Sequence, residues 1–363
     1  MERKIHFEKM RETGKIVIPL IKEIYSEFCP KNDDLSKSIN FFVNKRTNSD
    51  QCLLRPYLLR LGYEISGKVD WINIRHACAA IEIFNISTYQ SNLSFDEKYK
   101  IFNNIQKTNQ FISSMFSLDI VIFSILKLKD SFSSKVLLEI INRLHQTNND
   151  VYNGQFYDLN VLNINNESIY SIPEKDYLDL YFYRCEKLGG SLTSLCLELG
   201  GLLAGGDREL IDKLKKIGKI FGTAGQIVND ISDYIFPLGE GESVNGYQSK
   251  LDDFKKGKVT YPIFHLVNHI PLKKRDRIIE AQKNTTFDGN LIRDIERDLI
   301  YYDCITSIKK IATFYLKKLK KEIKKIPKSK YRDYLSLSFS SLVTNKYFAQ
   351  FRELGELYNE PKN

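Results

Sequence analysis

The sequence has few of the residues from which metal centres and nucleophilic active sites are commonly built. It holds six cysteines and five histidines in 363 residues, and no two cysteines have CxxC spacing. No cysteine lies near a histidine at the spacing of a zinc site, so we expect free thiols in a reducing compartment. His265 and His269 are four residues apart, but no third ligand accompanies them. We therefore expect structural histidines and no Ser/His/Asp type of catalysis.

Long apolar runs are also scarce, and none reaches the roughly 20 residues that span a bilayer. The first fifteen residues, MERKIHFEKMRETGK, are too charged to contain the apolar core of a signal peptide. Residues 190–206 are apolar, but Glu198 and several glycines interrupt them, and small residues let helices approach closely. We expect a cytoplasmic protein without a transmembrane segment, in which 190–206 forms a buried helix.

The formal net charge is +9, and much of the excess lies in residues 309–330. Apolar residues recur there at helical spacing, which is typical of a helix that faces the core and exposes a basic face to water. Attraction to an anionic membrane is the less favoured alternative, and we expect no nucleic-acid binding. The recurring apolar positions are Ile308, Ile311, Tyr315, Leu319, Ile323 and Ile326.

Apolar residues elsewhere recur mostly with helical period, which indicates an all-α protein. Residues 32–51 and 238–250 are polar and read as loops, and no linker divides the chain. We expect one helical domain over residues 1–363. The expected helices are 5–28, 53–63, 71–89, 108–129, 132–149, 173–204, 207–235, 251–269, 274–283, 290–325 and 329–356.

One polar cluster interrupts an otherwise apolar helix, GQIVNDISDY, which begins at Gly225. Asn229 and Asp233 are four residues apart and share one helical face, with Asp230 beside them. Oxygen ligands on one face suit Mg²⁺, which usually also binds substrate phosphates. Polar residues at this spacing are more often a solvated face, but burial among apolar neighbours would require partners for them.

The segment DDFKKGKVTYPIFHL follows after the second polar loop. Together the two segments resemble the trans-isoprenyl diphosphate synthases (the polyprenyl synthetase superfamily), in which FQxxDDxxD precedes D-x-x-x-G-K-x-T-x-P. Asn229 stands at the first aspartate of the family motif. The matching positions in this chain are Gln226, Asn229, Asp230, Asp233, Asp253, Gly257, Lys258, Thr260 and Pro262.

Further segments match the family in the same order, over about residues 50–350. GQFYD, with Gln155 and Asp158, matches G-Q-x-x-D, and CEKLGGSL, with Lys187, resembles the K-T-G segment. RPYLL from Arg55 matches R-P-x-L, and ACAAIEIFNIST resembles the helix before the first metal motif. The resemblance implies an all-α helical bundle of the isoprenoid synthase type with a central cavity, and Mg²⁺ as cofactor.

The chain departs from the family mainly where the acceptor, isopentenyl diphosphate, would bind. The first DDxxD should fall at Asn92 to Asp96, where the first two acids are absent. Cys52 replaces a lysine, and only Arg55 and Lys100 remain as candidate cations for the acceptor diphosphate. We expect Asn92 and Asp96 to face Asn229 and Asp233 as a substituted metal site with lowered affinity.

The resemblance implies ionisation of an allylic prenyl diphosphate, with Lys187 and Lys258 stabilising the departing diphosphate. Gln155, Asp158 and Gln226 are the other implied catalytic positions, and Thr260 is an implied substrate contact. The prenyl cation would pass to a non-standard acceptor or cyclise, as in a prenyltransferase or a terpene synthase. Two alternatives stay open: a chain-elongating synthase with substituted motifs, and a non-catalytic subunit that regulates an active partner.

Two further expectations come from the family's architecture. Bulky residues before the first metal motif limit chain length in the family, whereas Ser87 and Thr88 are small and the bulky Tyr89 lies about 100° further round the helix. We expect room for a farnesyl or longer chain. Residues 108–129 are a candidate surface for a homodimer, and a heteromeric partner is the alternative.

Overall fold

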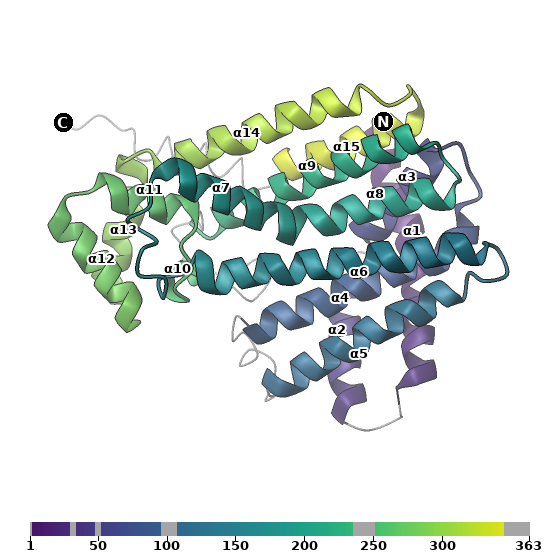
Figure 1. The fold of residues 1–363 in the computed structure, drawn as a ribbon, viewed down its shortest axis with the longest axis horizontal. Coiled ribbons are helices and arrows are strands. Elements are labelled where there is room, and N and C mark those ends of the chain that lie inside the picture. Colours follow the sequence, from purple (N-terminus) through teal and green to yellow (C-terminus); the bar gives the residue numbers. More distant parts are fainter. Residues whose placement is uncertain (1, 30–33, 48–51, 96–106, 235–250, 345–363) are drawn as a thin grey trace. The chain divides into compact units, whose positions relative to one another are not determined.

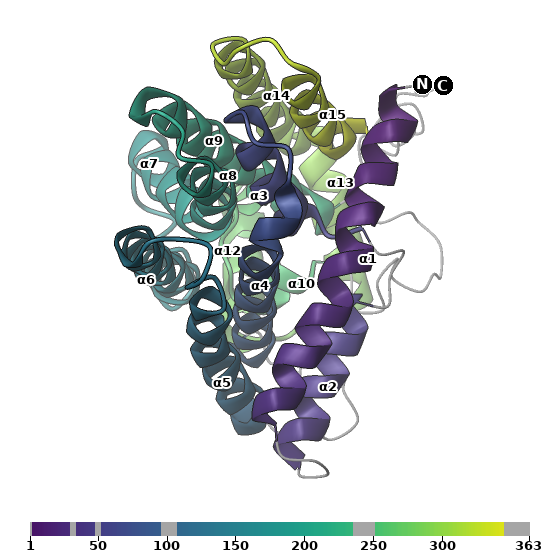
Figure 2. The same ribbon diagram turned by 90° about the vertical axis from the view of Figure 1, so that its right-hand side faces the viewer.

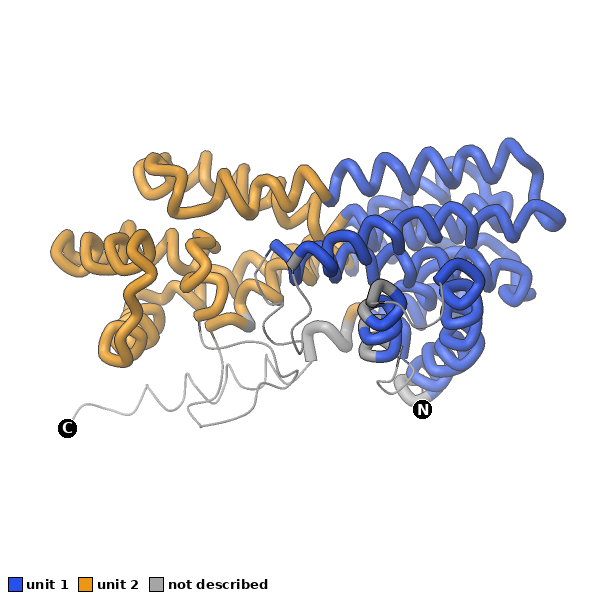
Figure 3. The backbone as a smooth tube through the Cα atoms, turned by 90° about the horizontal axis from the view of Figure 1, so that it is seen from below, with its two compact units in different colours: residues 1–151, 191–219, 320–338 blue, residues 152–190, 220–319, 339–363 orange. Residues whose placement is uncertain are grey.

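The computed structural model describes all residues except 1, 30–33, 48–51, 96–106, 235–250 and 345–363. Over the described ranges the chain is helical and contains no strand, which confirms the predicted all-α class (Figure 1). A single isolated antiparallel bridge joins Asn163 and Lys258. The chain forms two compact units, coloured separately in Figure 3. One domain over residues 1–363, with a central cavity, stays a prediction.

Unit 1 comprises residues 1–151, 191–219 and 320–338. Helix α4 packs along α5 and also contacts α1 and α3, and Figure 2 shows α4 between α5 and α1. Helix α8 packs against α3, and nearly all of its side chains are buried, which confirms the predicted buried helix. The helices named here are α1 (Glu2–Phe28), α3 (Leu54–Ile65), α4 (Arg75–Phe95), α5 (Lys107–Leu126) and α8 (Ser191–Leu203).

Helices α2 and α6 also lie wholly or mostly within the first 151 residues of this unit. Helix α2 (Asp34–Thr47) lies where we expected a loop, so that prediction was wrong. Its Ile39 and Val43 are buried and four residues apart, and this short apolar stripe anchors a helix that also carries several polar residues. Helix α6 (Ser134–Phe156) is seven residues longer at its C-terminus than the expected 132–149.

Unit 2 comprises residues 152–190, 220–319 and 339–363. Its core is rich in aromatic rings, and Tyr177 stacks on Phe264 with 3.7 Å between ring centroids. The Tyr177 hydroxyl donates to the backbone carbonyl of Val259 at 2.6 Å, which satisfies the polar end of a buried ring. This unit contains α7 (Glu174–Cys185), the C-terminal part of α9 (Arg208–Ser232), α10 (Asp252–Lys255), α11 (Tyr261–His269), α12 (Leu272–Asn284), α13 (Gly289–Tyr301) and most of α14 (Cys304–Ile323).

Two expected helices are each divided in the structure. The predicted helix 251–269 contains α10 and α11, because Gly257 has a φ of 79°, in the left-handed region. The predicted helix 290–325 contains α13 and α14, because Asp303 has a φ of 55°. Asp288 begins α13 as its N-cap, accepting from the backbone N–H groups of Asn290 at 2.8 Å and Leu291 at 2.7 Å.

The basic stretch 309–330 has the predicted amphipathic form. Ile308, Leu319 and Ile323 are buried, whereas the lysines between them are mostly exposed. Helix α5 requires a correction: its residues Thr108–Leu126 have the length and mean hydropathy, 1.5, of a membrane span, although we expected no such run. A single helix of this kind is weak evidence, since the core helix of a soluble protein passes the same test.

Candidate active site

The site in unit 2 is built around two helix ends that widen into one turn of π-helix. Helix α6 continues into η3 (Tyr157–Val161), which carries the buried Asp158. Helix α7 continues into η4 (Glu186–Gly190), which carries Lys187. A Cβ atom on Gly154 would lie 2.9 Å from the Cβ of Lys187, so the GQFYD and EKLGG segments are in direct contact. Such π-turns often occur at functional sites, because they re-aim side chains at the end of a helix.

Lys258 is fixed beside Asp158 by its backbone. The N–H of Ile164 donates to the carbonyl of Gly257 at 2.7 Å, and the N–H of Val259 donates to the carbonyl of Leu162 at 2.8 Å. A Cβ on Gly257 would lie 2.8 Å from Ile164, and its positive φ also favours glycine. The glycine before Lys258 therefore allows this segment to run close against the residues that follow η3.

The Lys258 ammonium lies 2.8 Å from Oδ2 of Asp158 and 3.5 Å from Oδ1 of Asp253. Lys258 and Asp158 are both buried, and such a pair is stable only with good geometry and further hydrogen bonds. Those come from a second cation, Arg184, which the sequence had not indicated as functional.

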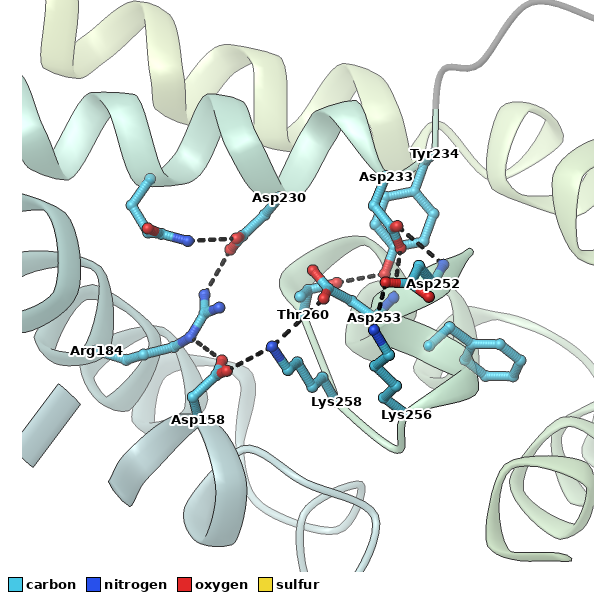
Figure 4. Close-up of polar contacts among 12 residues, drawn as sticks. Asp158, Arg184, Asp230, Asp233, Tyr234, Asp252, Asp253, Lys256, Lys258 and Thr260 are labelled. Atoms are coloured by element: carbon cyan, nitrogen blue, oxygen red, sulfur yellow. Dashed lines mark hydrogen bonds and ion pairs between the residues drawn. The ribbon is translucent and has the colours of Figure 1, made fainter. Parts of the chain in front are cut away.

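Arg184 bridges two carboxylates from different segments (Figure 4). Its Nε donates to Oδ1 of Asp158 at 2.5 Å, and its Nη1 donates to Oδ2 of Asp230 at 2.6 Å. Asp230 also accepts from the Tyr181 hydroxyl at 2.8 Å and from the Gln226 amide at 3.0 Å. Burial by itself disfavours the charged form of Asp158, but Arg184 and Lys258 outweigh it and lower the pKa of Asp158 to about 2.

Asp233, which directly follows α9 (Arg208–Ser232), has a different role from Asp230. Its two carboxylate oxygens accept the backbone N–H groups of Asp252 at 2.9 Å and Asp253 at 3.2 Å. Burial, followed by the nearby carboxylates of Asp253 and Asp252, raises the pKa of Asp233 well above its ordinary value. In this structure Asp233 therefore caps the short helix α10 and is turned towards it.

Thr260 and the remaining predicted residues of unit 2 are also placed. Thr260 is buried, forms a hydrogen bond with the Tyr234 hydroxyl and immediately precedes α11. Gln155 is buried, Asn229 is exposed on α9, and Lys187 is half-buried, with its ammonium 5.4 Å from the centroid of the Tyr183 ring. The structure thus brings Asp158, Lys258 and Asp230 into one network and places Lys187 beside the segment that carries Asp158.

The residues predicted for the acceptor side and the first metal motif belong to unit 1. Arg55 is half-buried in the first turn of α3, and Asn92 is half-buried in α4. Asp96 and Lys100 lie outside the described residues. The expectation that Asn92 and Asp96 face Asn229 and Asp233 therefore stays a prediction.

The small residues expected to leave room for a long prenyl chain lie on α4. The Ser87 hydroxyl is buried and donates to the carbonyl of Ser114 on α5 at 2.9 Å. Thr88 is half-buried and bonds within its own helix, to the carbonyl of Asn85 at 2.9 Å. Tyr89, the next residue along α4, is also half-buried. The role of these residues as a pocket floor stays a prediction.

Sequence reasoning missed Arg184 and Tyr181, although a signal for them exists. Tyr177, Tyr181 and Arg184 lie at positions i, i+4 and i+7 of α7 and therefore share one helical face. That face is buried, so an arginine on it must have acidic partners. A charged residue on the buried face of an aromatic helix would have pointed to the network before its partners were known.

The described residues do not fit a metal ion at the second motif. No group of three histidine, cysteine, aspartate or glutamate side chains within the described ranges could hold one. The carboxylate oxygens of Asp230 and Asp233 accept instead from protein donors, and both residues are buried. The assignment of Asn229, Asp230 and Asp233 as metal ligands finds no support in these contacts and stays a prediction.

Solved structures share this fold. A polyprenyl synthase from Caulobacter crescentus, complexed with calcium and isoprenyl diphosphate, has a TM-score of 0.76 at 15% identity and covers 94% of this chain and 98% of its own. A geranylgeranyl pyrophosphate synthase from Lactobacillus brevis has a TM-score of 0.74 at 18% identity. The match covers 94% of this chain and 99% of that synthase. At these identities the likeness shows the fold alone.

Sequence comparisons add the family. The chain is 24% identical over 160 residues to heptaprenyl diphosphate synthase component 2 of Bacillus subtilis, covering 44% of this chain and 43% of that protein. It is 23% identical over 294 residues to a short chain isoprenyl diphosphate synthase of Methanocaldococcus jannaschii, covering 77% of this chain and 80% of that protein. The chain thus spans less than half the length of the first of these relatives. The family model for polyprenyl synthetase matches residues 102–297, more than half of the chain, and the chain belongs to the polyprenyl synthetase family.

Proposed function

We propose that this chain binds an allylic prenyl diphosphate, ionises it, and passes the prenyl cation to an acceptor other than isopentenyl diphosphate or cyclises it. One observation carries the proposal: the segments expected to hold the allylic diphosphate assemble in unit 2. GQFYD contacts EKLGG at Gly154, and Asp158 pairs with Lys258 at 2.8 Å. Relatives named as prenyl diphosphate synthases support the substrate class.

The leaving diphosphate would be stabilised by the ammonium groups of Lys187 and Lys258. Lys258 is paired with Asp158, and that carboxylate alone would offset its charge. Arg184 binds the other oxygen of the same carboxylate, so Lys258 shares Asp158 with a second cation, while its other acidic neighbour, Asp253, lies further away at 3.5 Å. Because the described residues of the second motif do not fit a metal ion, we assign no step to one. The requirement for Mg²⁺ that the resemblance implies stays a prediction.

The acceptor side supports the choice of a non-standard acceptor. Cys52 stands where the family has a lysine, and Arg55 is the one acceptor-side candidate cation that the structure describes. Each charge-assisted hydrogen bond to a diphosphate contributes about 1.5–3 kcal/mol. The lysine at Cys52 is lost, and Lys100 would stand in for a family arginine without its bidentate fork. Together these two changes correspond to roughly a 30- to several-thousand-fold weaker complex with isopentenyl diphosphate.

A second candidate function is a non-catalytic subunit of a prenyl synthase. The engaged carboxylates of Asp230 and Asp233 favour it, because a protein without metal ligands at this motif would ionise diphosphates slowly. The name "component 2" of the Bacillus relative is consistent with a heteromeric partner. Chain elongation with substituted motifs is the third candidate, since the relatives' names describe polyprenyl products.

The test is incubation of the purified chain, in buffer with Mg²⁺, with geranyl, farnesyl or geranylgeranyl diphosphate, each with and without isopentenyl diphosphate. Diphosphate release and organic products are measured together. Consumption of an allylic substrate without isopentenyl diphosphate supports the proposal, and it should be abolished by Lys187→Gln. The matched control is Lys216→Gln, because Lys216 is half-exposed and pairs with Glu322 in unit 1.

Two outcomes would contradict the proposal. Efficient conversion of farnesyl plus isopentenyl diphosphate to longer diphosphates would make this a chain-elongating synthase. No turnover of any allylic substrate by the folded chain, even with a partner synthase added, would favour the non-catalytic subunit.

A further inference from the structure

Asp158 and Asp230 come from η3 and α9, far apart in the sequence, yet one guanidinium binds both. Arg184 reaches them at 2.5 Å and 2.6 Å, and all three side chains are at most 4% exposed. Two buried carboxylates this close to one another require a cation between them, because their mutual repulsion and their desolvation both oppose ionisation. In this chain the cation between them is a side chain.

A guanidinium suits this position. It is planar, carries its donors in a fixed fork and stays protonated at all relevant pH values, so it can bridge two carboxylates with directed hydrogen bonds. The remaining acceptor capacity of Asp230 is used as well, by the Tyr181 hydroxyl at 2.8 Å and the Gln226 amide at 3.0 Å. A metal ion at Asp230 would have to displace Arg184 and leave a buried positive charge with one partner fewer.

We propose that Arg184 takes the place of a divalent cation at the second motif, so that Asp230 is not a metal ligand in this chain. Arg184 is then a positioning residue: it holds Asp158 where that carboxylate orients Lys258 towards the substrate. The inference deepens the proposed function and rests on it for the identity of the substrate. The binding of cations to the protein can be measured independently of any turnover.

The first experiment titrates Mn²⁺ into the full chain and follows free Mn²⁺ by electron paramagnetic resonance, with and without inorganic diphosphate. The wild type is compared with Asp230→Asn. If Asp230 does not bind metal, the two proteins should have Mn²⁺ affinities within about twofold of one another in both conditions. A loss of more than about tenfold in Asp230→Asn would overturn the proposal, since removing one charged ligand from a divalent site is expected to cost that much.

The second experiment removes the internal cation. Arg184→Gln leaves two adjacent carboxylates, and it should bind Mn²⁺ at least about tenfold more tightly than the wild type. Saturating Mn²⁺ should then raise its Tm by roughly 2–4 °C more than that of the wild type. The double variant Arg184→Gln/Asp230→Asn is the matched control, because it loses one positive and one negative charge, and its Mn²⁺ affinity should return to the wild-type value.

A folded Arg184→Gln protein that gains no affinity for Mn²⁺ would contradict the inference. Should that variant not fold, the comparison of wild type with Asp230→Asn still decides the matter. Failure of the proposed function would appear differently, as absent turnover of allylic substrates in a wild type whose Mn²⁺ binding does not depend on Asp230.

Discussion

The guanidinium of Arg184 lies 2.6 Å from Oδ2 of Asp230, although the two residues are 46 positions apart and lie on different helices. Since Arg184 also binds Asp158, one side chain connects α7 and η3 with α9 inside unit 2. The contact is buried, so its loss should be costly for folding, independently of any role in catalysis.

Arg184→Gln should lower the free energy of unfolding by about 3–5 kcal/mol, the usual cost of removing one partner from a buried ion pair. The control is Arg277→Gln, which removes an arginine that is 52% exposed and pairs with Asp294, itself 37% exposed, at 3.2 Å. Exposed pairs contribute little, so the control should change stability by less than about 1 kcal/mol. Urea denaturation followed by circular dichroism measures both. Equal effects of the two substitutions would show that the network does not stabilise the fold.

The stability of the protein should fall in acid partly through Asp158. Its pKa is about 2 in the folded protein, against roughly 3.9 in an unfolded chain. A lowered carboxyl pKa contributes stability above pH 4 that is lost as the pH falls towards 2, and at neutral pH this amounts to about 2–3 kcal/mol. Urea midpoints measured from pH 5 to pH 2 check this. Asp158→Asn should be less stable at neutral pH and should show a shallower loss in acid.

Gly257→Ala should destabilise the protein by about 1–3 kcal/mol, because Gly257 combines a φ of 79° with a contact of 2.8 Å between the added Cβ and Ile164. Gly205→Ala is the matched control: its φ is 68°, but nothing lies within 4 Å of the added Cβ. Gly205→Ala therefore measures the backbone strain alone, about 1 kcal/mol. The difference between the two variants measures the steric contact with Ile164. Thermal unfolding should therefore give the larger loss for Gly257→Ala, and a loss no larger than that of Gly205→Ala would mean that Ile164 moves aside.

A homodimer stays a prediction, and α5 offers the surface for it. Its exposed apolar side chains include Phe111 at 38%, Met115 at 43% and Phe123 at 47%. Light scattering should give twice the chain mass for the wild type at micromolar concentration and a monomer for Met115→Asp/Phe123→Asp. Leu272→Asp, at a residue 72% exposed in unit 2, is the control and should leave the mass unchanged. A wild type that is monomeric would contradict the prediction.

The sequence was sufficient for the helical class and for most helices, because apolar periodicity reports which side of a helix is buried. It failed where one residue interrupts a continuous pattern. Asp303 has a left-handed backbone conformation, but an aspartate in the sequence does not predict one. The sequence therefore indicated one helix where the structure has α13 and α14. Helix α2 was missed because its apolar residues lie in a stretch rich in serine and asparagine, and the burial of Ile39 and Val43 becomes visible only in three dimensions.

The site was predicted unevenly for a similar reason. Motif spacing indicated Asp158, Lys258 and Asp230, and the structure joins them in one network. Spacing does not show which oxygen faces which donor, so the engagement of Asp233 with the backbone of α10 could not be foreseen. Arg184 belongs to no motif, and only the burial of its helical face reveals its importance.

The cap that Asp233 forms on α10 also gives this residue an indirect influence on Lys258. The carboxylate of Asp233 accepts the backbone N–H groups of Asp252 at 2.9 Å and Asp253 at 3.2 Å. Asp253 in turn places its own carboxylate 3.5 Å from the Lys258 ammonium. Loosening the cap would therefore shift an acidic neighbour of Lys258 without altering Lys258 itself, so a substitution at Asp233 would change the electrostatics of the site from outside the Arg184 network.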